Sequence, residues 1–450
     1  MKKKKKILTI ALAALATLSA SAEGYQVNTL SARQVAMGHT GVAQKLGAES
    51  MYFNPAALSF SNKTLDLSAG VTGIISTAGA TINNKYYETD NKVSTPLYVH
   101  AAFKVYDNLQ AGVSFYTPYG SNINWSKNWA GAVLNQSVKL STYVVQPTIS
   151  YRILNNLSVG VGLCIAWGSV DLNKALVNPK SLDMLINATQ MPVPTFGETS
   201  PASVNLKGTA EVAVGYNVGI MWDINEHFTL GLSARSKMQM KVKTGDASVE
   251  YANEIAEQLL QDKIGVINSA NFKAEMPMPM TTTIGVCYKP NKRWKFAFDA
   301  QMTKWNAYEN LDIEFLSEQL NPFNQHIEKN YKNAWAFRVG AQYALTDRMD
   351  LRAGFNYDMT PVDNNFYNPE TPGMDKISPS LGFSFRPYSR LSIDVACAYV
   401  HGLSEDNASC NYDDFIYKNY PQFGQPATQT IKGKYTVHAW TPSIGVSYSF

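Results

Sequence analysis

Bulky apolar residues alternate with small or polar residues along most of the chain after residue 64. Residues 157–167 read LSVGVGLCIAW and residues 335–343 read WAFRVGAQY, so every second side chain is large and apolar. This period of two is typical of a β-strand with one apolar face. The other face carries Gly, Ser, Gln, Arg and Asp, which suits the interior of a barrel whose outer surface contacts lipid. The pattern therefore predicts transmembrane β-strands.

The connections between these strands alternate between short and long. Short turns rich in Asn and Asp, which favour tight turns, are predicted at 107–108, 155–156, 225–226, 291–292, 347–348 and 388–390. Longer connections are predicted at 73–95, 117–138, 169–205, 243–275, 304–330, 359–376 and 402–432. Six turns and seven loops join fourteen strands, and an even strand number with short periplasmic turns is the outer-membrane arrangement. We therefore predict an all-β membrane fold, a 14-stranded antiparallel transmembrane β-barrel with short helices in its extracellular loops.

The final segment has the same alternation. Residues 440–450 read WTPSIGVSYSF, and the sequence stops at Phe450. A last amphipathic strand with a terminal aromatic residue resembles the C-terminal signature of outer-membrane barrels, which the barrel-assembly machinery recognises. The alternative is an ordinary edge strand of a soluble sandwich. We expect the assembly machinery to be a partner of this chain through Phe450.

The N-terminal segment is not a strand. Residues 1–22 have the basic, apolar and small-residue regions of a secretory signal peptide. Glycines then break any periodicity before the first strand, and a barrel of this size has a lumen that needs filling. We therefore expect a signal peptide at 1–22, an N-terminal hatch (plug) inside the lumen at 23–63 and the barrel at 64–450. The expected hatch and gating residues are Gly38, Gly41, Asn54, Pro55 and Ala56.

Composition narrows the classes of function. Charged residues make up 16% of the chain and aromatic residues 12%, and no apolar run of about 20 residues, the length of a transmembrane helix, follows the signal peptide. Without the five lysines of residues 2–6, 34 of the 39 basic residues remain against 35 acidic ones, so nothing indicates nucleic-acid binding. No phosphate-binding loop, nucleophile elbow or spaced set of metal ligands appears, so we expect no enzyme activity, cofactor or metal. The four cysteines fit no disulfide framework, and their pairing stays open.

Two long loops carry helical patterns. Ser181 is predicted to cap one short helix, and residues 249–263 have apolar positions at helical spacing. The apolar faces of these helices are equally suited to line a ligand groove or to pack on each other. The candidate groove residues are Leu182, Leu185, Ile186, Leu259 and Leu260.

Arginines at inward-facing strand positions are candidates for binding an anionic substrate group. These lumen cations are Arg338, Arg352 and Arg386. Four acidic residues share the inward parity: Asp299, Asp350, Asp358 and Asp394. The favoured interpretation is therefore that the arginines form ion pairs within the lumen.

Residues 24–58 resemble the hatch of the FadL-type long-chain fatty-acid transporters of the bacterial outer membrane. The matching pieces are GYQVN at 24–28, Gly38 and Gly41 in the middle, and NPAAL at 54–58. The resemblance implies a fourteen-stranded barrel with an N-terminal hatch. It also implies passive uptake of hydrophobic molecules, long-chain fatty acids first among them, that are captured by extracellular loops.

The same resemblance implies how the substrate leaves the barrel. Hatch rearrangement and an inward kink in the third strand would open a lateral exit through the wall. The third strand here is residues 110–116, and Pro118 and Gly120 mark a candidate break, since Pro removes a ladder donor and Gly adds freedom. An ordinary strand end is the alternative.

The implied partners are a hydrophobic small molecule (a fatty acid or a hydrocarbon) and outer-membrane lipid, in a monomer located in the outer membrane of a Gram-negative bacterium. The alternative function is a structural or general-diffusion barrel without lipid specificity. An apolar pocket above Asn54 would favour transport of lipid, whereas a continuous polar pore would favour diffusion.

Overall fold

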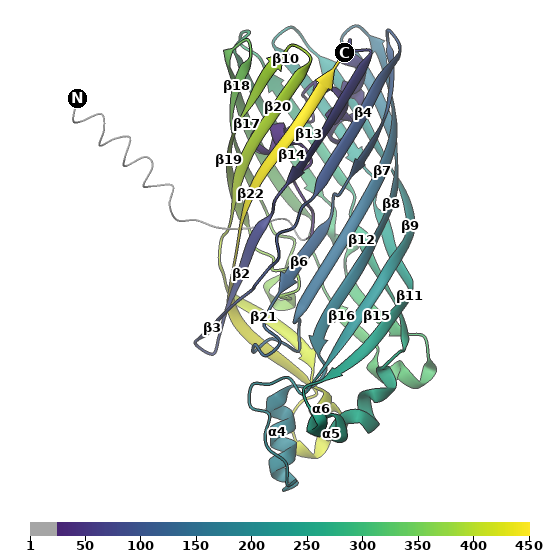
Figure 1. The fold of residues 1–450 in the computed structure, drawn as a ribbon, viewed down its shortest axis with the longest axis vertical. Helices are drawn as coiled ribbons and strands as arrows, with labels where there is room; N and C mark the ends of the chain where they lie inside the picture. Colours follow the sequence, from purple (N-terminus) through teal and green to yellow (C-terminus); the bar gives the residue numbers. More distant parts are fainter. Residues whose placement is uncertain (1–24) are drawn as a thin grey trace, which may run out of the picture.

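Twenty-two β-segments form one closed antiparallel barrel (Figure 1). The computed structural model describes residues 25–450, so the predicted signal peptide lies outside the described residues. Eight of the barrel strands consist of two segments in succession and six are continuous, which gives the predicted fourteen strands. The barrel closes where β22 pairs with β1, and the backbone N–H of Phe450 donates to the carbonyl of Leu65 at 2.9 Å.

The continuous strands are β7 (Ser137–Leu154), β8 (Leu157–Ala175), β9 (Ala202–Asp223), β18 (Met349–Asp358), β19 (Lys376–Tyr388) and β22 (Thr428–Ser449). The interrupted strands are β1/β2 (Leu65–Thr72, Ile75–Ile82), β3/β4 (Lys85–Glu88, Leu97–Tyr106), β5/β6 (Leu109–Tyr116, Gly120–Asn124), β10/β11 (Phe228–Arg235, Met238–Tyr251), β12/β13 (Asn271–Met278, Thr281–Tyr288), β14/β15 (Trp294–Thr303, Asn310–Phe315), β16/β17 (Gln325–Glu328, Ala334–Thr346) and β20/β21 (Leu391–Gly402, Glu405–Asp413).

The two ends of the barrel differ as the loop lengths predict. The six predicted short turns all join neighbouring strands at one end, drawn at the top of Figure 1, where the C-terminus also lies. The longer loops and the helices α4, α5 and α6 lie at the other end. By the outer-membrane rule the first end faces the periplasm and the second the cell exterior.

The strands continue further towards the exterior than the sequence pattern predicts. Several predicted loops contain paired strand segments: β2 and β3 lie within 73–95, β6 within 117–138, and β15 and β16 within 304–330. The outer face of this part carries exposed ion pairs, such as Lys243–Glu211 at 2.8 Å and Lys273–Glu314 at 2.9 Å. Because these outward positions are charged rather than apolar, the alternation that reveals a lipid-facing strand is missing there.

The outer-loop helices begin at other residues than predicted. Helix α4 (Pro179–Ala188) is capped by Asn178, whose side chain accepts from the Lys180 N–H at 3.0 Å, and Ser181 lies inside the helix. Helix α5 (Glu254–Ile264) is capped by Asn253. The predicted helical face was wrong at its start, because Val249 belongs to β11. Helix α6 (Phe415–Asn419) packs against α4.

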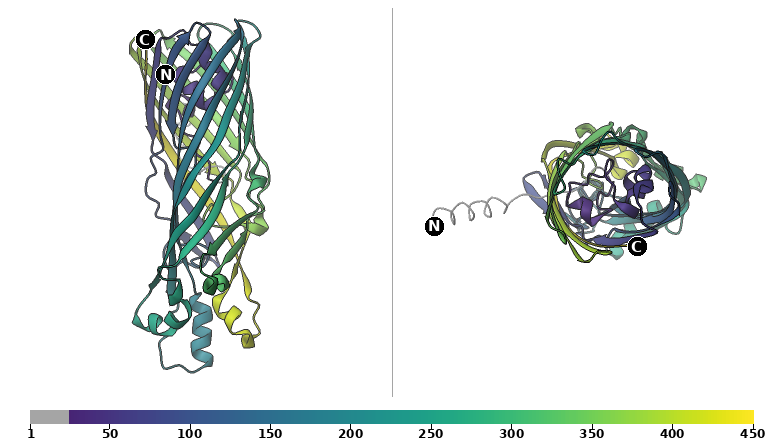
Figure 2. Two further views of the ribbon diagram at one scale, coloured as in Figure 1. Left: turned by 90° about the vertical axis from the view of Figure 1, so that its right-hand side faces the viewer. Right: turned by 90° about the horizontal axis from the view of Figure 1, so that it is seen from above.

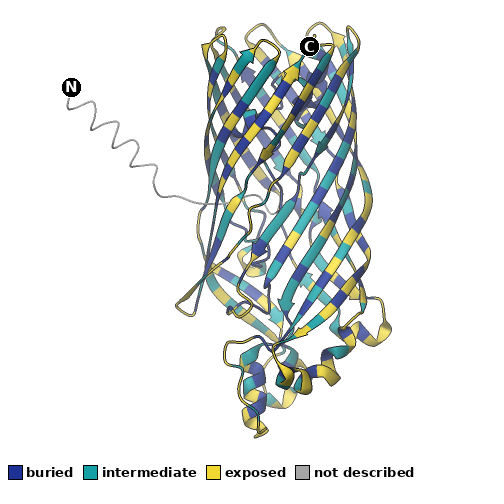
Figure 3. Cartoon of the chain, viewed as in Figure 1, coloured by how far each residue is buried: buried dark blue, intermediate teal, exposed yellow. Residues whose placement is uncertain are grey.

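Along the strands of the periplasmic half of the barrel, exposed and buried positions alternate (Figure 3). The exposed positions there include many large apolar side chains, which form an apolar band. Aromatic rings gather at its outer margin: Phe115 and Trp167 both lie close to Tyr143, with ring centroids 6.1 Å and 6.0 Å away. On the other side of the β22–β1 pairing that closes the barrel, the ring centroids of Tyr399 and Trp440 lie 4.3 Å apart. Such rings mark the membrane–water interface of outer-membrane barrels. Among residues 25–450, no helix is long and apolar enough to cross a membrane.

The N-terminal segment lies inside the ring of strands, as the view along the barrel shows (Figure 2). We call residues 25–63 the hatch. It contains short helices only: α2 (Ala32–Val35), η1 (Gly47–Glu49), α3 (Ser50–Phe53) and η2 (Pro55–Phe60). Its side chains are buried almost throughout, so the periplasmic half of the lumen is filled by polypeptide.

Candidate functional site

The hatch rests on pairs of glycines that face each other on neighbouring strands. These pairs are Gly160 with Gly219, Gly231 with Gly285, and Gly340 with Gly354. A Cβ added at Gly219 would lie 2.0 Å from Oδ1 of Asn54, and one at Gly231 would lie 2.1 Å from the Val42 carbonyl oxygen. Inward-facing glycines therefore form a belt, which we call the glycine belt, that lets the hatch backbone touch the wall.

Gly38 and Gly41, both predicted as hatch residues, occupy crowded positions, Gly38 against the wall and Gly41 against the ring of Phe53 within the hatch. Gly38 has a φ of +64°, and a Cβ there would lie 2.7 Å from the carbonyl oxygens of Val339 and Phe355. The Gly41 N–H donates to the Asp299 carboxylate at 2.7 Å. A side chain at Gly38 would push the hatch away from the wall, whereas one at Gly41 would collide with the Phe53 ring, 2.4 Å away.

The glycine belt gives a direct stability prediction. We expect Gly354→Ala to destabilise the folded protein by about 1–3 kcal/mol, the usual cost of overpacking, because the new methyl would lie 1.9 Å from the Gly38 nitrogen. The temperature at which the folded band disappears in heat-modifiable gel electrophoresis measures the effect. Gly73→Ala is the control, since its methyl would meet no atom nearer than 3.7 Å. Equal midpoints for the two variants would contradict a tight fit of the hatch.

Asn54, Pro55 and Ala56 attach the hatch to the strands β7, β8 and β9. The Asn54 side chain donates to the carbonyls of Val42 at 2.7 Å and Ile220 at 3.0 Å, and its Oδ1 accepts from the Ala56 N–H. Two serine hydroxyls of the wall donate to the Ala56 carbonyl, those of Ser150 and Ser158. This motif is therefore an anchor that ties hatch backbone to barrel backbone.

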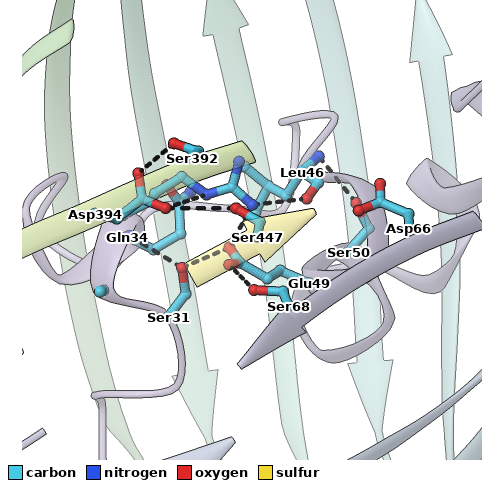
Figure 4. Close-up of polar contacts among 12 residues, drawn as sticks. Ser31, Gln34, Leu46, Glu49, Ser50, Asp66, Ser68, Ser392, Asp394 and Ser447 are labelled. Atoms are coloured by element: carbon cyan, nitrogen blue, oxygen red, sulfur yellow. Dashed lines mark hydrogen bonds and ion pairs between the residues drawn. The ribbon is translucent and has the colours of Figure 1, made fainter. Parts of the chain in front are cut away.

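A cluster of charged groups attaches the hatch on its other side (Figure 4). Arg33 contacts the carboxylates of Glu49 at 3.1 Å and Asp394 at 3.7 Å, and Glu49 also accepts from the hydroxyls of Ser31 and Ser68 at 2.6 Å each. Burial opposes ionisation of Glu49, but Arg33 and the two hydroxyls hold the pKa of Glu49 below its usual range. The hatch thus carries a charged cross-link to the wall strands β1 and β20.

The third barrel strand is interrupted at residues 117–119, between β5 and β6. Its last ladder pair with the second strand is Tyr98–Tyr116, and beyond that point β6 pairs with β7 alone. The start of the hatch takes the vacated place: the Val27 N–H donates to the Pro118 carbonyl at 2.8 Å, and the Gly120 N–H donates to the Tyr25 carbonyl at 2.9 Å. Pro118 and Gly120, the predicted break residues, thus form the backbone hydrogen bonds between the hatch and the wall.

A cavity of about 770 Å³ opens at this interruption. Its lining includes hatch residues 26–29, Val93–Leu97 on one edge of the gap, Thr117 and Tyr119–Asn124 on the other, and Tyr143. Tyr143 belongs to the outward-facing aromatic cluster with Phe115 and Trp167. A cavity that reaches from the hatch to an outward-facing ring passes through the wall, and we call it the wall cavity.

A second, apolar cavity of about 90 Å³ adjoins the wall cavity on the exterior side of the hatch. Its lining includes Leu206, Met240, Val242 and Phe272, and it shares Leu140 and Thr142 with the wall cavity. We call it the apolar cavity. Glu370 lies at its border in a buried ion pair with Lys329. The lumen therefore offers an apolar compartment next to a gap in the wall.

The predicted lumen cations lie among acidic and polar side chains of the lumen. Arg386 contacts Asp350 at 2.6 Å, and Arg352 lies 3.3 Å from Asp350 and 3.7 Å from Asp394. Arg338 donates to the Gln301 side chain at 2.8 Å and faces Asp299 across the β14–β17 ladder.

The predicted groove residues lie in the packing of the outer loops. Leu182, Leu185, Ile186 and Leu260 are buried and Leu259 is half-buried, and the linings of the wall and apolar cavities contain none of these five. Sequence reasoning missed Arg33, Glu49 and the glycine belt. Glycines at inward positions of otherwise regular strands were a usable signal for the belt, because they mark close backbone approach.

His39 lies in the hatch, and the four cysteines lie on barrel strands. His39 is buried against the Phe53 ring, 4.9 Å between centroids. Burial and the neighbouring Arg338 hold the pKa of His39 well below its usual value. The four cysteines are free. Within residues 25–450, no group of His, Cys, Asp and Glu is placed to hold a metal ion.

Comparison with known proteins gives a consistent result. Residues 13–450 match the family model described as outer membrane protein transport protein (OMPP1/FadL/TodX). A long-chain fatty acid transport protein of Escherichia coli O6:H1 is 22% identical over 420 residues, which cover 88% of this chain and 91% of that one. The crystal structure of a Pseudomonas aeruginosa FadL homologue superposes with a TM-score of 0.77 at 20% identity and covers 95% of this chain and 100% of that one. The Ralstonia pickettii toluene transporter TbuX superposes with a TM-score of 0.67 at 15% identity and covers 94% and 99%.

Proposed function

The chain belongs to the outer membrane protein transport protein family (OMPP1/FadL/TodX), and from that premise we propose that it takes up long-chain fatty acids. Members of this family are transport channels of the outer membrane. The proposed route runs from the exterior loops into the apolar cavity, past the first residues of the hatch, and out sideways through the wall cavity. No energy source or enzymatic step is needed on this route.

The observation that carries the proposal is the apolar cavity beside an interrupted strand. A water-filled pore gives an alkyl chain no favourable environment, whereas each methylene moved from water into an apolar site gains about 0.8 kcal/mol. The wall cavity and the apolar cavity share lining residues such as Leu140. Hatch residues 25–27 lie across the gap, where Val27 is bonded to Pro118 and Tyr25 to Gly120. Movement of this short piece would join the two compartments.

The position of the gap suits delivery into the membrane. The interruption begins two residues after Phe115, whose ring belongs to the aromatic cluster at the outer margin of the apolar band. Amphipathic molecules are stable at this depth, because a polar head can stay wet while the chain enters lipid. We therefore propose lateral exit at Pro118–Gly120, with the rest of the hatch held by the Asn54 anchor and the Arg33 cluster.

The alternative is a general-diffusion or structural barrel without lipid specificity. The apolar cavity and the hatch that fills the periplasmic half of the lumen favour transport of lipid. We further propose that the protein acts as a monomer without enzyme activity, and that Phe450, which is exposed at the periplasmic rim, is presented to the barrel-assembly machinery.

Uptake of radiolabelled oleate by cells that lack their own transporter tests the proposal. We expect cells that produce this protein to accumulate oleate well above vector-only cells, with correct insertion verified by heat-modifiable migration. If the inserted protein gives no more uptake than the vector, the fatty-acid assignment fails. Uptake of toluene without oleate would instead assign the channel to neutral hydrocarbons. Mass spectrometry of lipid that co-purifies with the protein gives an independent readout.

A further inference from the structure

A buried arginine without a carboxylate partner lies between the hatch and the interrupted strand. Arg235, the last residue of β10, is 8% exposed. Its guanidinium donates to the Tyr116 hydroxyl at 3.1 Å and to the Tyr52 carbonyl at 3.0 Å, which are both neutral groups. Among residues 25–450 no carboxylate forms an ion pair with it, in contrast to Arg33, Arg352 and Arg386.

Two tyrosine rings compensate part of this charge. The guanidinium carbon lies 4.5 Å from the Tyr52 ring centroid and 5.5 Å from the Tyr116 centroid. Cation–π contacts stabilise a buried cation, but by less than a paired carboxylate in hydrogen-bonding geometry. A buried charge without an anionic partner is costly, so this position favours an anion brought from outside the chain.

The arginine faces a small polar cavity of about 40 Å³. Its lining also includes His39, Asn217, Asp299 and Gln301. Both ring nitrogens of His39 and Oδ1 of Asp299 are buried without a hydrogen-bond partner. The volume is enough for a few water molecules or one small polar group, since a water needs at least about 10–15 Å³ on this measure. A polar cavity with unsatisfied groups is suited to hold a head group and not an alkyl chain.

The polar cavity is connected to the proposed route. It shares Gln26, His39 and Tyr119 with the wall cavity. The one carboxylate in its lining is Asp299, whose Oδ2 is occupied by the N–H groups of Gly41 and Val42 and which faces Arg338 in the strand register. An anionic head at Arg235 would therefore leave its chain in the wall cavity, directed towards the gap.

We propose that Arg235 binds the carboxylate of the substrate during its passage to the gap and so selects fatty acids over neutral molecules of the same length. This inference rests on the proposed function. The planar guanidinium fork matches a carboxylate in two parallel hydrogen bonds. Arg235 is then the residue that separates an acid-selective channel from a hydrocarbon channel.

Paired uptake assays test this selectivity. Radiolabelled oleate and oleyl alcohol have the same chain and differ in charge. We expect Arg235→Gln to lower oleate uptake roughly tenfold, the ratio that about 1.4 kcal/mol of binding produces, and to leave oleyl alcohol uptake within about twofold of wild type, a near-neutral change on the same scale. Arg235→Lys keeps the charge but loses the fork, so its oleate uptake should be intermediate. Arg152→Gln is the control, because Arg152 donates to the Asp107 carbonyl at the periplasmic end, away from the cavities.

The outcomes separate this inference from the proposed function. Equal losses of oleate and oleyl alcohol uptake in Arg235→Gln, or no loss of either, would overturn the role of Arg235. Transport of the alcohol but not of oleate by the wild-type protein would also overturn it, while leaving a hydrophobic channel. Transport of neither by wild type would defeat the proposed function itself. If Arg235→Gln does not show the folded band, the lysine variant supplies the comparison.

Discussion

A disulfide between positions 26 and 119 is expected to stop oleate uptake while it is oxidised and to release it on reduction. Gln26 and Tyr119 face each other as an isolated antiparallel pair, flanked by the bonds from Val27 to Pro118 and from Gly120 to Tyr25. This is a non-hydrogen-bonded pair, with Cα atoms about 4.5 Å apart, a separation that a disulfide can span. The Gln26→Cys, Tyr119→Cys double variant would hold the first hatch residues across the wall cavity. Oleate uptake with and without a reductant, compared with vector-only cells, measures the effect.

The two single-cysteine variants are the controls for this experiment. Each carries one of the two side-chain losses but cannot form the link, and both keep the four native cysteines, which are free in the structure. Peptide mass analysis of the oxidised protein verifies the bond. If the oxidised double variant takes up oleate as fast as the reduced one, the first residues of the hatch do not gate the gap.

The sequence predicts the membrane-facing part of the barrel well, because lipid imposes a strict pattern there. Residues 157–167 alternate cleanly since each second side chain must be apolar, and tight turns such as 155–156 need Asn or Asp. Nothing comparable acts on the outer face of β21 or β15, which stand beyond the aromatic cluster and carry charged residues. Strand formation in this outer part depends on pairing with the neighbouring strand, and the alternation of apolar and polar residues within one segment does not reveal that pairing.

Gly38 and Asn54 were selected because residues 24–58 lack strand periodicity and resemble a known hatch, and their gating role stays a prediction. In the structure Gly38 has a positive φ and Asn54 caps a short helix, backbone roles that suit these residue types. The Arg33 contact with Asp394 was not predictable, because it joins distant parts of the sequence and depends on how the hatch sits in the lumen. Arg235 gave no signal at all. What distinguishes Arg235 from the other buried arginines is that its hydrogen-bond partners are neutral groups, and only the three-dimensional structure shows these partners.

Replacing Asn54 is expected to lower oleate uptake roughly tenfold while the barrel still folds. Asn54→Ala would remove the hydrogen bonds that the side chain donates to the carbonyls of Val42 and Ile220 and the one it accepts from the Ala56 N–H, at about 0.5–1.5 kcal/mol for each lost bond. If the anchor is loosened, the whole hatch can shift together with its first residues, and the gap beside Pro118 then opens less often. A change of about 1.4 kcal/mol in the equilibrium between the closed and open gap changes the open population tenfold. Oleate uptake and heat-modifiable migration of the same samples measure transport and folding separately.

Asn54→Asp sharpens this test because it keeps the size of the side chain and the cap acceptor but loses the two donated hydrogen bonds. If the donors to Val42 and Ile220 hold the hatch, the aspartate variant should transport as poorly as the alanine variant. Asn62→Ala is the matched control, since Asn62 is an exposed hatch asparagine. Loss of the folded band in both Asn54 variants would place the residue in barrel assembly instead. Normal uptake by a folded Asn54→Asp protein would mean that the hatch body is held by the Arg33 cluster and the glycine belt without this anchor.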